Sequence, residues 1–356
     1  MPLRTELQKA IKEILEYQNV DGGIPATNPG DNSGAWTTAS CLESFLECGY
    51  MPIKYFIKIG KMVDYLLDIQ LSDGGWPLVD SDSSCTMATG HAISAFILAK
   101  DIFDTPLTQK IDLSISRGLK WISMHQNQDG GWGVEPSGGA AGQLTRIAAT
   151  SYALRPYWIQ GVKFSDSSVV RDAIAYFERT QRADGGWAYA EGDMLGDFSD
   201  TSNTARALIC MIKSGRFSNT SPQALKALST IKSQKVAGTS WKLGIEGFLL
   251  ESTPTQNVYH NNGPCDALES LLVAGDYGRE TIEGFWWLLS SQRDNGVWHL
   301  SSPDQTQRFA NVWTWSTSEF IHVINMASEK LLRHMISDRP LDNEKKGFLR
   351  RIFGEK

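Results

Sequence analysis

Residues 177–189 read FERTQRADGGWAY, an apolar helix-like stretch followed by glutamine, Asp-Gly-Gly and tryptophan. The same order occurs in LLDIQLSDGGWPL and ISMHQNQDGGWGV, and more loosely in LEYQNVDGGIPA and LLSSQRDNGVWHL. A catalytic motif is rarely needed so many times in one chain, so the string indicates a structural repeat. The glutamines that mark the copies are Gln18, Gln70, Gln126, Gln181 and Gln292.

The spacing of these glutamines predicts six copies. Successive glutamines lie 52, 56, 55 and 111 residues apart, and the last interval is double the others. A degenerate copy, ALKALSTIKSQKVAGTSWK, fills that interval and keeps Gln234 and Trp241 in frame. The repeats therefore cover residues 1–330, which we treat as one domain, and a tail follows at 331–356.

Each copy predicts a pair of helices. The first, such as VVRDAIAYFERTQ, has apolar residues at three-four spacing and ends at the glutamine, where Asp-Gly-Gly favours a left-handed C-cap. The second, such as TSNTARALICMI, begins near Ser, Thr or Asp after a polar loop. No stretch alternates convincingly with period two, so the fold class is all-α. One pair cannot bury both faces, so the six hairpins must stack, either as an open solenoid or as a closed ring. The first and last copies carry no obvious polar capping repeat, which favours closure into an α/α toroid, an α6/α6 barrel. The second helices should lie inside, with their N-termini at one rim.

The bulk properties exclude several classes of partner. A formal net charge of −6 over 356 residues argues against nucleic acid, which needs a basic surface. No apolar run approaches the roughly 20 residues of a membrane-spanning helix, and the N-terminus lacks the pattern of a signal peptide. The cysteines are scattered through helical sequence, which indicates reduced thiols in a cytoplasmic protein: Cys41, Cys48, Cys85, Cys210 and Cys265.

Gln-x-x-x-Gly-x-Trp at the end of an apolar helix resembles the QW repeat of squalene cyclases and protein prenyltransferase β subunits. The resemblance covers about residues 1–330 and implies the toroid. It also implies that the repeat tryptophans tie neighbouring repeats together without taking part in chemistry: Trp76, Trp132, Trp187, Trp241 and Trp298. The tail ends in KKGFLRRIFGEK, which mixes basic and apolar residues. We expect it to be either a peripheral membrane contact or a solvated terminus.

The fourth copy carries the candidate catalytic acids in EGDMLGDFSDTSNTARAL. This stretch resembles the Asp-x-Asp-Asp-Thr motif of class II terpene cyclases, in which the middle aspartic acid protonates an alkene or epoxide. Asp197 matches the first position and Asp200 the last, whereas Ser199 replaces the middle acid. The candidate catalytic residues are therefore Asp193, Asp197 and Asp200. A proton donor must be kept neutral by burial or by a neighbouring carboxylate; the alternative is that Asp200 is only an N-cap.

Polar residues at equivalent positions of successive second helices predict a polar layer in the cavity: His91, Tyr152, Arg206, Asp266 and Ser318. Aromatic residues near the starts of these helices are candidates to stabilise cations, which ring faces do at distances below roughly 6 Å. The full set of candidate substrate-binding residues is Trp36, His91, Tyr152, Asn203, Arg206, Asp266, Trp313 and Trp315.

Metal sites are considered in two places. The resemblance to prenyltransferases implies a zinc site made by Asp, Cys and His, but the available residues stand at unsuitable spacings, so we predict no metal ligands there: His260, Cys265, Asp266 and His322. Asp80 and Asp82 in the second copy, facing the acids of the fourth copy across the pore, are candidates to hold Mg²⁺ and a diphosphate. A solvated acidic loop is the alternative.

The resemblance favours an isoprenoid-processing enzyme of terpene cyclase type, which cyclises or isomerises a polyprenyl substrate in the cavity. The alternatives are a prenyltransferase-like enzyme, a non-catalytic binding or scaffold toroid, and a pectate lyase-like enzyme, since some pectate lyases share the string at Gln70–Pro77. A deep apolar cavity would favour the cyclase, whereas a polar or collapsed pore would favour the scaffold.

Overall fold

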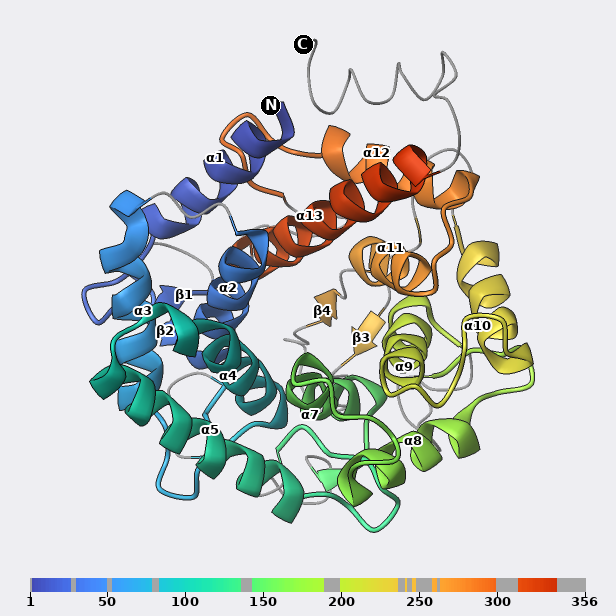
Figure 1. Cartoon of the computed structure of the whole chain (residues 1–356), viewed down its shortest axis with the longest axis horizontal. Helices are drawn as coiled ribbons and strands as arrows, with labels where there is room; N and C mark the ends of the chain where they lie inside the picture. Colours follow the sequence, from blue (N-terminus) through green and yellow to red (C-terminus); the bar gives the residue numbers. More distant parts are fainter. Residues whose placement is uncertain are drawn as a thin grey trace.

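The computed structural model describes residues 2–26, 30–49, 53–78, 83–135, 143–188, 199–235, 241, 245–247, 258–260, 263–298 and 313–337. In these residues, helices form two concentric rings (Figure 1). The outer ring contains α1 (Pro2–Glu16), α3 (Phe56–Asp68), α5 (Thr105–Met124), α8 (Ser168–Thr180), α10 (Pro222–Ser233) and α12 (Arg279–Ser290). The inner ring contains α2 (Ala35–Cys48), α4 (Thr86–Ala99), α7 (Ile147–Ile159), α9 (Thr201–Lys213), α11 (Gly263–Val273) and α13 (Trp313–Ser337).

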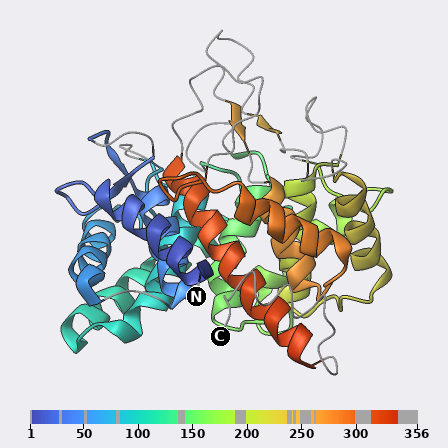
Figure 2. The same cartoon turned by 90° about the horizontal axis from the view of Figure 1, so that it is seen from above.

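Short elements join the rings. The 3₁₀ helix η1 (Ile53–Tyr55) precedes α3, and η2 (Lys100–Ile102) follows α4. Strand β1 (Ile24–Pro25) pairs antiparallel with β2 (Ser33–Gly34), and β3 (Ile245–Gly247) pairs antiparallel with β4 (Val258–His260). These strands lie on the side of the ring where α13 begins, while α13 ends at the opposite rim (Figure 2).

The inner ring is closed. Each inner helix packs against the next along the chain, and α13 packs against α2. The two rings differ in burial because of their patterns. Residues 201–211 of α9 are all buried, whereas α8 buries one face and exposes the other. Inner helices approach closely at Gly90, where an added Cβ would lie 2.2 Å from the carbonyl oxygen of Tyr152. The predicted all-α toroid is therefore confirmed, with the second helices inside.

The repeat tryptophans fold back over the helices that precede them. Each buried indole N–H donates to a carbonyl oxygen in the preceding outer helix. The bonds are Trp76 to Leu66 at 2.7 Å, Trp132 to Ile122 at 2.8 Å, Trp187 to Phe177 at 2.9 Å, Trp241 to Ile231 at 2.8 Å and Trp298 to Leu288 at 2.8 Å. The tryptophans thus anchor each repeat loop to its helix.

The repeat glutamines connect one copy to the next. The Gln126 amide donates to the carbonyl of Gly130 at 2.7 Å and to that of Val169, at the start of the next outer helix, at 2.9 Å. Gln292 makes the same bonds to Gly296 and, across the ring closure, to Glu6 at 3.2 Å. The glutamines therefore provide the links between repeats.

The Asp-Gly-Gly segment does not form the C-cap of the first helix, as the sequence predicted, but lies beyond the end of that helix. Helix α5 ends at Met124, and Gly130 lies in a separate turn closed by a bond from its N–H to the Asn127 carbonyl. Its φ of 93° requires glycine, and an added Cβ would lie 2.2 Å from the Asp172 carbonyl oxygen. The expected helix C-cap is thus a turn that lets the backbone approach the next outer helix.

The last helix continues past residue 330. Helix α13 runs to Ser337, and Leu331 is buried in the core. The remaining residues of the tail predicted at 331–356 lie outside the described part of the chain. Within the described part, no helix is long and apolar enough to span a membrane.

Candidate functional site

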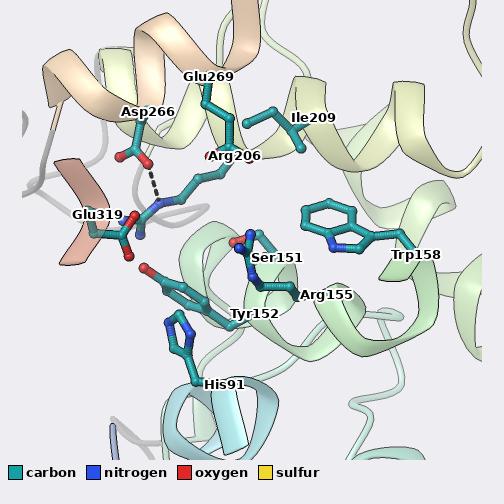
Figure 3. A pocket seen from close by; sticks show the side chains of 10 residues that line it. All are labelled: His91, Ser151, Tyr152, Arg155, Trp158, Arg206, Ile209, Asp266, Glu269 and Glu319. Atoms are coloured by element: carbon teal, nitrogen blue, oxygen red, sulfur yellow. Dashed lines mark hydrogen bonds and ion pairs between the residues drawn. The ribbon is translucent and has the colours of Figure 1, made fainter. Parts of the chain in front are cut away.

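The inner helices α4, α7, α9, α11 and α13 line a small polar cavity inside the ring. The cavity has a volume of about 30 Å³, which is the room that one water molecule takes. Figure 3 shows the lining residues: His91, Ser151, Tyr152, Arg155, Trp158, Arg206, Ile209, Asp266, Glu269 and Glu319. The structure thus brings together four of the predicted polar-layer residues, and at this depth the lumen is charged rather than apolar.

One half of the site is an ion pair between α9 and α11. Arg206 Nε lies 3.4 Å from Asp266 Oδ1, and the guanidinium carbon lies 4.9 Å from the centre of the Tyr152 ring. Burial raises the pKa of Asp266 to about 7, because desolvation and the nearby Glu319 charge outweigh the opposing charge of Arg206. Asp266 is therefore a carboxyl group that exchanges its proton near neutral pH.

The other half is a histidine oriented by a carboxylate. His91 Nδ1 lies 2.9 Å from Oε2 of Glu43, a residue of α2, and Arg155 Nε donates to the other oxygen of Glu43. Burial raises the pKa of Glu43, but Arg155 and His91 outweigh burial and hold that pKa below its usual value. Glu43 is therefore an ionised acceptor, and His91 Nδ1 donates a hydrogen bond to it.

His322 has a different environment from His91. Its Nδ1 pairs with Glu47, and its Nε2 lies 3.3 Å from Oε1 of Glu269. Burial opposes the charge, but the two carboxylates raise the pKa of His322 well above its usual value. The pKa of Glu269 falls to about 2, because His322 and Arg155 outweigh its burial. His322 is thus a buried imidazolium held between two carboxylates.

Of the three predicted catalytic acids, Asp200 is described and lies buried at the N-terminus of α9. Its carboxylate accepts from the Asn203 backbone N–H at 2.8 Å and from the Asn203 amide at 2.7 Å. Donors to a carboxylate and the positive end of a helix both favour its ionised form. Asp200 is therefore an N-cap, and Asn203 extends that cap. Asp193 and Asp197 lie outside the described residues.

Ser199, which stands at the middle-acid position, belongs to the repeat loop. Its hydroxyl donates to Asp184 Oδ1 at 2.9 Å, just as the hydroxyl of Ser84 donates to Asp73 at 2.8 Å in the second copy. The degenerate fifth copy reinforces this loop, because the Gln234 amide donates to the Ser199 carbonyl at 2.7 Å. The serine therefore has a structural role that the sequence alone did not reveal.

The predicted aromatic residues take several positions. The Trp36 and Trp315 rings pack with their centres 4.7 Å apart, and both indole N–H groups are buried without a hydrogen bond to any described residue. The side chain of Trp313 is outside the described part. Ser318 does not line the cavity; its hydroxyl lies 2.8 Å from that of Ser40. Glu319, the next residue, lines the cavity instead.

Sequence reasoning missed four charged residues of the lumen. The sequence could have indicated them, because each of these charged residues interrupts an otherwise apolar helix, as in CLESFLE and YALRPYW. A charge there must be paired within the ring. The missed residues are Glu43, Arg155, Glu269 and Glu319.

The zinc alternative is not supported by the residues that the structure describes. The Cys265 thiol is buried, and burial raises its pKa well above the usual value. Asp266 pairs with Arg206, and His322 pairs with carboxylates. No group of at least three potential ligands converges in the described ranges. The side chain of His260, and Asp80 and Asp82, lie outside them.

Comparison with known proteins finds similarity to cyclases. Residues 31–189 match the family described as squalene-hopene cyclase C-terminal domain. The chain is 24% identical over 226 residues to drimenyl diphosphate synthase of Streptantibioticus cattleyicolor, covering 63% of this chain and 39% of that protein. It is 23% identical to a probable squalene–hopene cyclase of Sinorhizobium fredii, covering 63% of this chain and 36% of that protein. The chain thus spans less than half the length of these relatives.

Solved structures share the fold. A variant of the type II terpene cyclase MstE from Scytonema, in complex with geranylgeranyl dihydroxybenzoate, superposes with a TM-score of 0.61 at 14% identity, covering 92% of this chain and 98% of that chain. A glycosidase superposes with a TM-score of 0.62 at 11% identity, covering 92% and 96%. Since both enzymes share the toroid, the fold alone does not determine the reaction.

Proposed function

Because the chain is a member of the squalene cyclase-like superfamily, we propose that it is a class II-like terpene cyclase. It would cyclise or isomerise a polyprenyl substrate by protonation inside the toroid. The observation that carries the proposal is the buried Asp200 carboxylate at the mouth of inner helix α9, at the end of a stretch that resembles the family's acidic motif. The name of the Streptantibioticus cattleyicolor relative, drimenyl diphosphate synthase, supports an isoprenoid substrate.

We propose different roles for the acids of this cluster. Asp200 receives two hydrogen bonds from Asn203, so it acts as the ionised member. A neighbouring carboxylate raises the pKa of a second acid, which then keeps its proton. Asp197, at the first position of the motif, is the acid proposed to protonate the substrate, and Asp193 is a further acid of the same loop.

Aromatic side chains would stabilise the cation that follows protonation. The Trp36 and Trp315 pair lies at the starts of α2 and α13, and Tyr152 and Trp158 line the lumen. Ring faces attract cations by roughly 0.5–2 kcal/mol each.

The test is product formation from polyprenyl diphosphates of graded length, with and without Mg²⁺. We expect Asp197→Asn to reduce turnover at least a hundredfold, and Asp200→Asn to reduce it by a smaller factor. Asp104→Asn is the matched control, because Asp104 caps the N-terminus of outer helix α5 by accepting from Leu107 N–H at 3.3 Å. Full activity of both Asp197→Asn and Asp200→Asn would contradict the proposal.

A second candidate is a toroid that binds a polar ligand without cyclase chemistry. The small, charged lumen cavity favours it, because an isoprenoid chain needs a large apolar space. In this case the wild type would convert no polyprenyl diphosphate. Oligosaccharides, and not isoprenoids, would then raise its melting temperature.

A further inference from the structure

His91 carries an unused hydrogen-bonding atom inside the lumen. The ring is 2% exposed, and its Nε2 is buried and makes no hydrogen bond to any residue of the described part. The Tyr152 ring lies alongside with its centre 4.7 Å from that of His91. A buried nitrogen without a partner is costly, so it indicates a missing water or ligand group.

The partner of Nδ1 determines what Nε2 can do. Because the ionised Glu43 accepts a hydrogen bond from Nδ1, Nε2 is the nitrogen that bears the lone pair whenever the ring is neutral, and it can then act as a base. Arg155 fixes Glu43 from the other side. The arrangement matches a general base oriented by a carboxylate. His322 cannot act in this way, because both of its ring nitrogens face carboxylates.

The cavity beside His91 has the size and polarity for one water molecule. Its volume of about 30 Å³ suffices for a single water, which requires two to four polar partners. In Figure 3 the Tyr152 ring lies directly above His91, and the Tyr152 hydroxyl points toward the Glu319 carboxylate. The charged residues that line it are Arg155 from α7, Arg206 from α9, Asp266 and Glu269 from α11, and Glu319 from α13, while Glu43 from α2 contacts His91 from behind.

We propose that His91, oriented by Glu43, is the base that activates a water molecule in this cavity, so that the reaction ends in hydration and yields a cyclic alcohol. The inference rests on the proposed function, which supplies the carbocation. The water oxygen forms a C–O bond to the cationic carbon, one of its O–H bonds breaks, and that proton passes to His91 Nε2. The ionised Glu43 stabilises the resulting imidazolium. The sum is one water added across a double bond, and no oxidant or reductant is needed.

The experiment is turnover of a polyprenyl diphosphate in H₂¹⁸O, analysed by mass spectrometry. We expect the wild type to give an alcohol that contains one ¹⁸O. His91→Gln keeps a donor to Glu43 but lacks the base, so the ratio of alcohol to alkene should fall at least tenfold. His125→Gln, at a ring that bonds the Trp121 carbonyl in a repeat loop, should leave that ratio unchanged. A wild-type alkene without ¹⁸O would overturn the inference and leave the cyclase intact.

A measurement without turnover separates the two proposals. If no substrate is converted, the proposed function fails, and ¹⁵N NMR of the histidine rings still tests the base. We expect His91 to have a protonated Nδ1 and an unprotonated Nε2 at pH 8, while His322 stays an imidazolium. Water near Nε2 should give a cross-relaxation signal that His91→Gln removes. A charged His91 at pH 8, or a dry cavity, would overturn the inference.

Discussion

The repeat loops and the lumen follow opposite rules. In the loops, copies of one pattern make the same bonds, as when Trp132 and Trp187 each donate to a carbonyl of the preceding helix. In the lumen, equivalent positions on the inner helices carry different side chains, such as His91 on α4 and Arg206 on α9. The constant residues hold the toroid together, and the variable ones give the cavity its chemistry. Substitutions should therefore affect stability in the loops and chemistry in the lumen.

Trp187→Ala should cause the largest loss of stability. The side chain is buried, and its indole N–H bonds the Phe177 carbonyl, so truncation leaves a cavity and removes this hydrogen bond. We expect a loss of about 3–5 kcal/mol in the free energy of unfolding, measured by urea denaturation. Trp158→Ala, at a half-buried ring of the lumen, should cost less stability and more activity. Equal losses of stability would remove the contrast between the regions.

Asp266→Asn should change how stability depends on pH. The folded pKa of about 7 lies above the unfolded value near 3.8, so between these values the folded state binds the extra proton. Wild-type stability should therefore fall as pH rises from about 4 to 7, by at most roughly 1.4 kcal/mol per pH unit from this group. The asparagine side chain of the variant cannot titrate, so its denaturation midpoints at pH 5 and 7 should differ less than those of the wild type. An identical pH profile would show that Asp266 is ionised throughout.

Gln292→Ala tests whether ring closure uses the same interaction as the other joints. This substitution removes the hydrogen bonds to the carbonyls of Gly296 and Glu6. Gln126→Ala removes the corresponding bonds to Gly130 and Val169. Each substitution removes two part-buried hydrogen bonds, so we expect a loss of about 1–2 kcal/mol in both cases. Thermal denaturation of the two variants measures this. A much larger loss for Gln292→Ala would make closure the weak point of the toroid.

Two substitutions of Asp200 distinguish its role as a helix cap from a role in catalysis. Asp200→Ala removes the N-cap of α9 and should cost about 1 kcal/mol, whereas Asp200→Asn keeps a capping oxygen and should cost only a few tenths. Melting temperatures should therefore rank the wild type and the Asp200→Asn variant above the Asp200→Ala variant. Turnover should instead fall in both variants. If turnover falls only in the variant whose melting temperature falls, Asp200 acts only as a helix cap.

The periodic part of the molecule was predictable from sequence, because each repeat satisfies the same local rules. Gln126 and Trp132 recur at fixed spacing, and the helix pairs can bury their faces only by stacking on one another. The site was less predictable. In the sequence, Ser199 stands where the motif has its middle acid. In the structure, its hydroxyl stabilises the repeat loop by donating to Asp184.

The unpredicted charges of the lumen share one physical cause. Glu43 and Arg155 lie on helices that are far apart in the sequence, and each is tolerated inside only because the ring brings them together. Nothing local in either helix identifies the partner. Glu319 replaces the predicted Ser318 because the serine hydroxyl instead pairs with Ser40 across the closure of the ring.

Turnover in D₂O tests the central claim most directly, because a protonation-initiated reaction must leave a solvent hydrogen in the product. Incubation of the wild type with geranylgeranyl diphosphate in D₂O should give a cyclic product with one deuterium at a carbon that does not exchange. A product without carbon-bound deuterium, formed at the same rate, would contradict proton-initiated chemistry in this toroid.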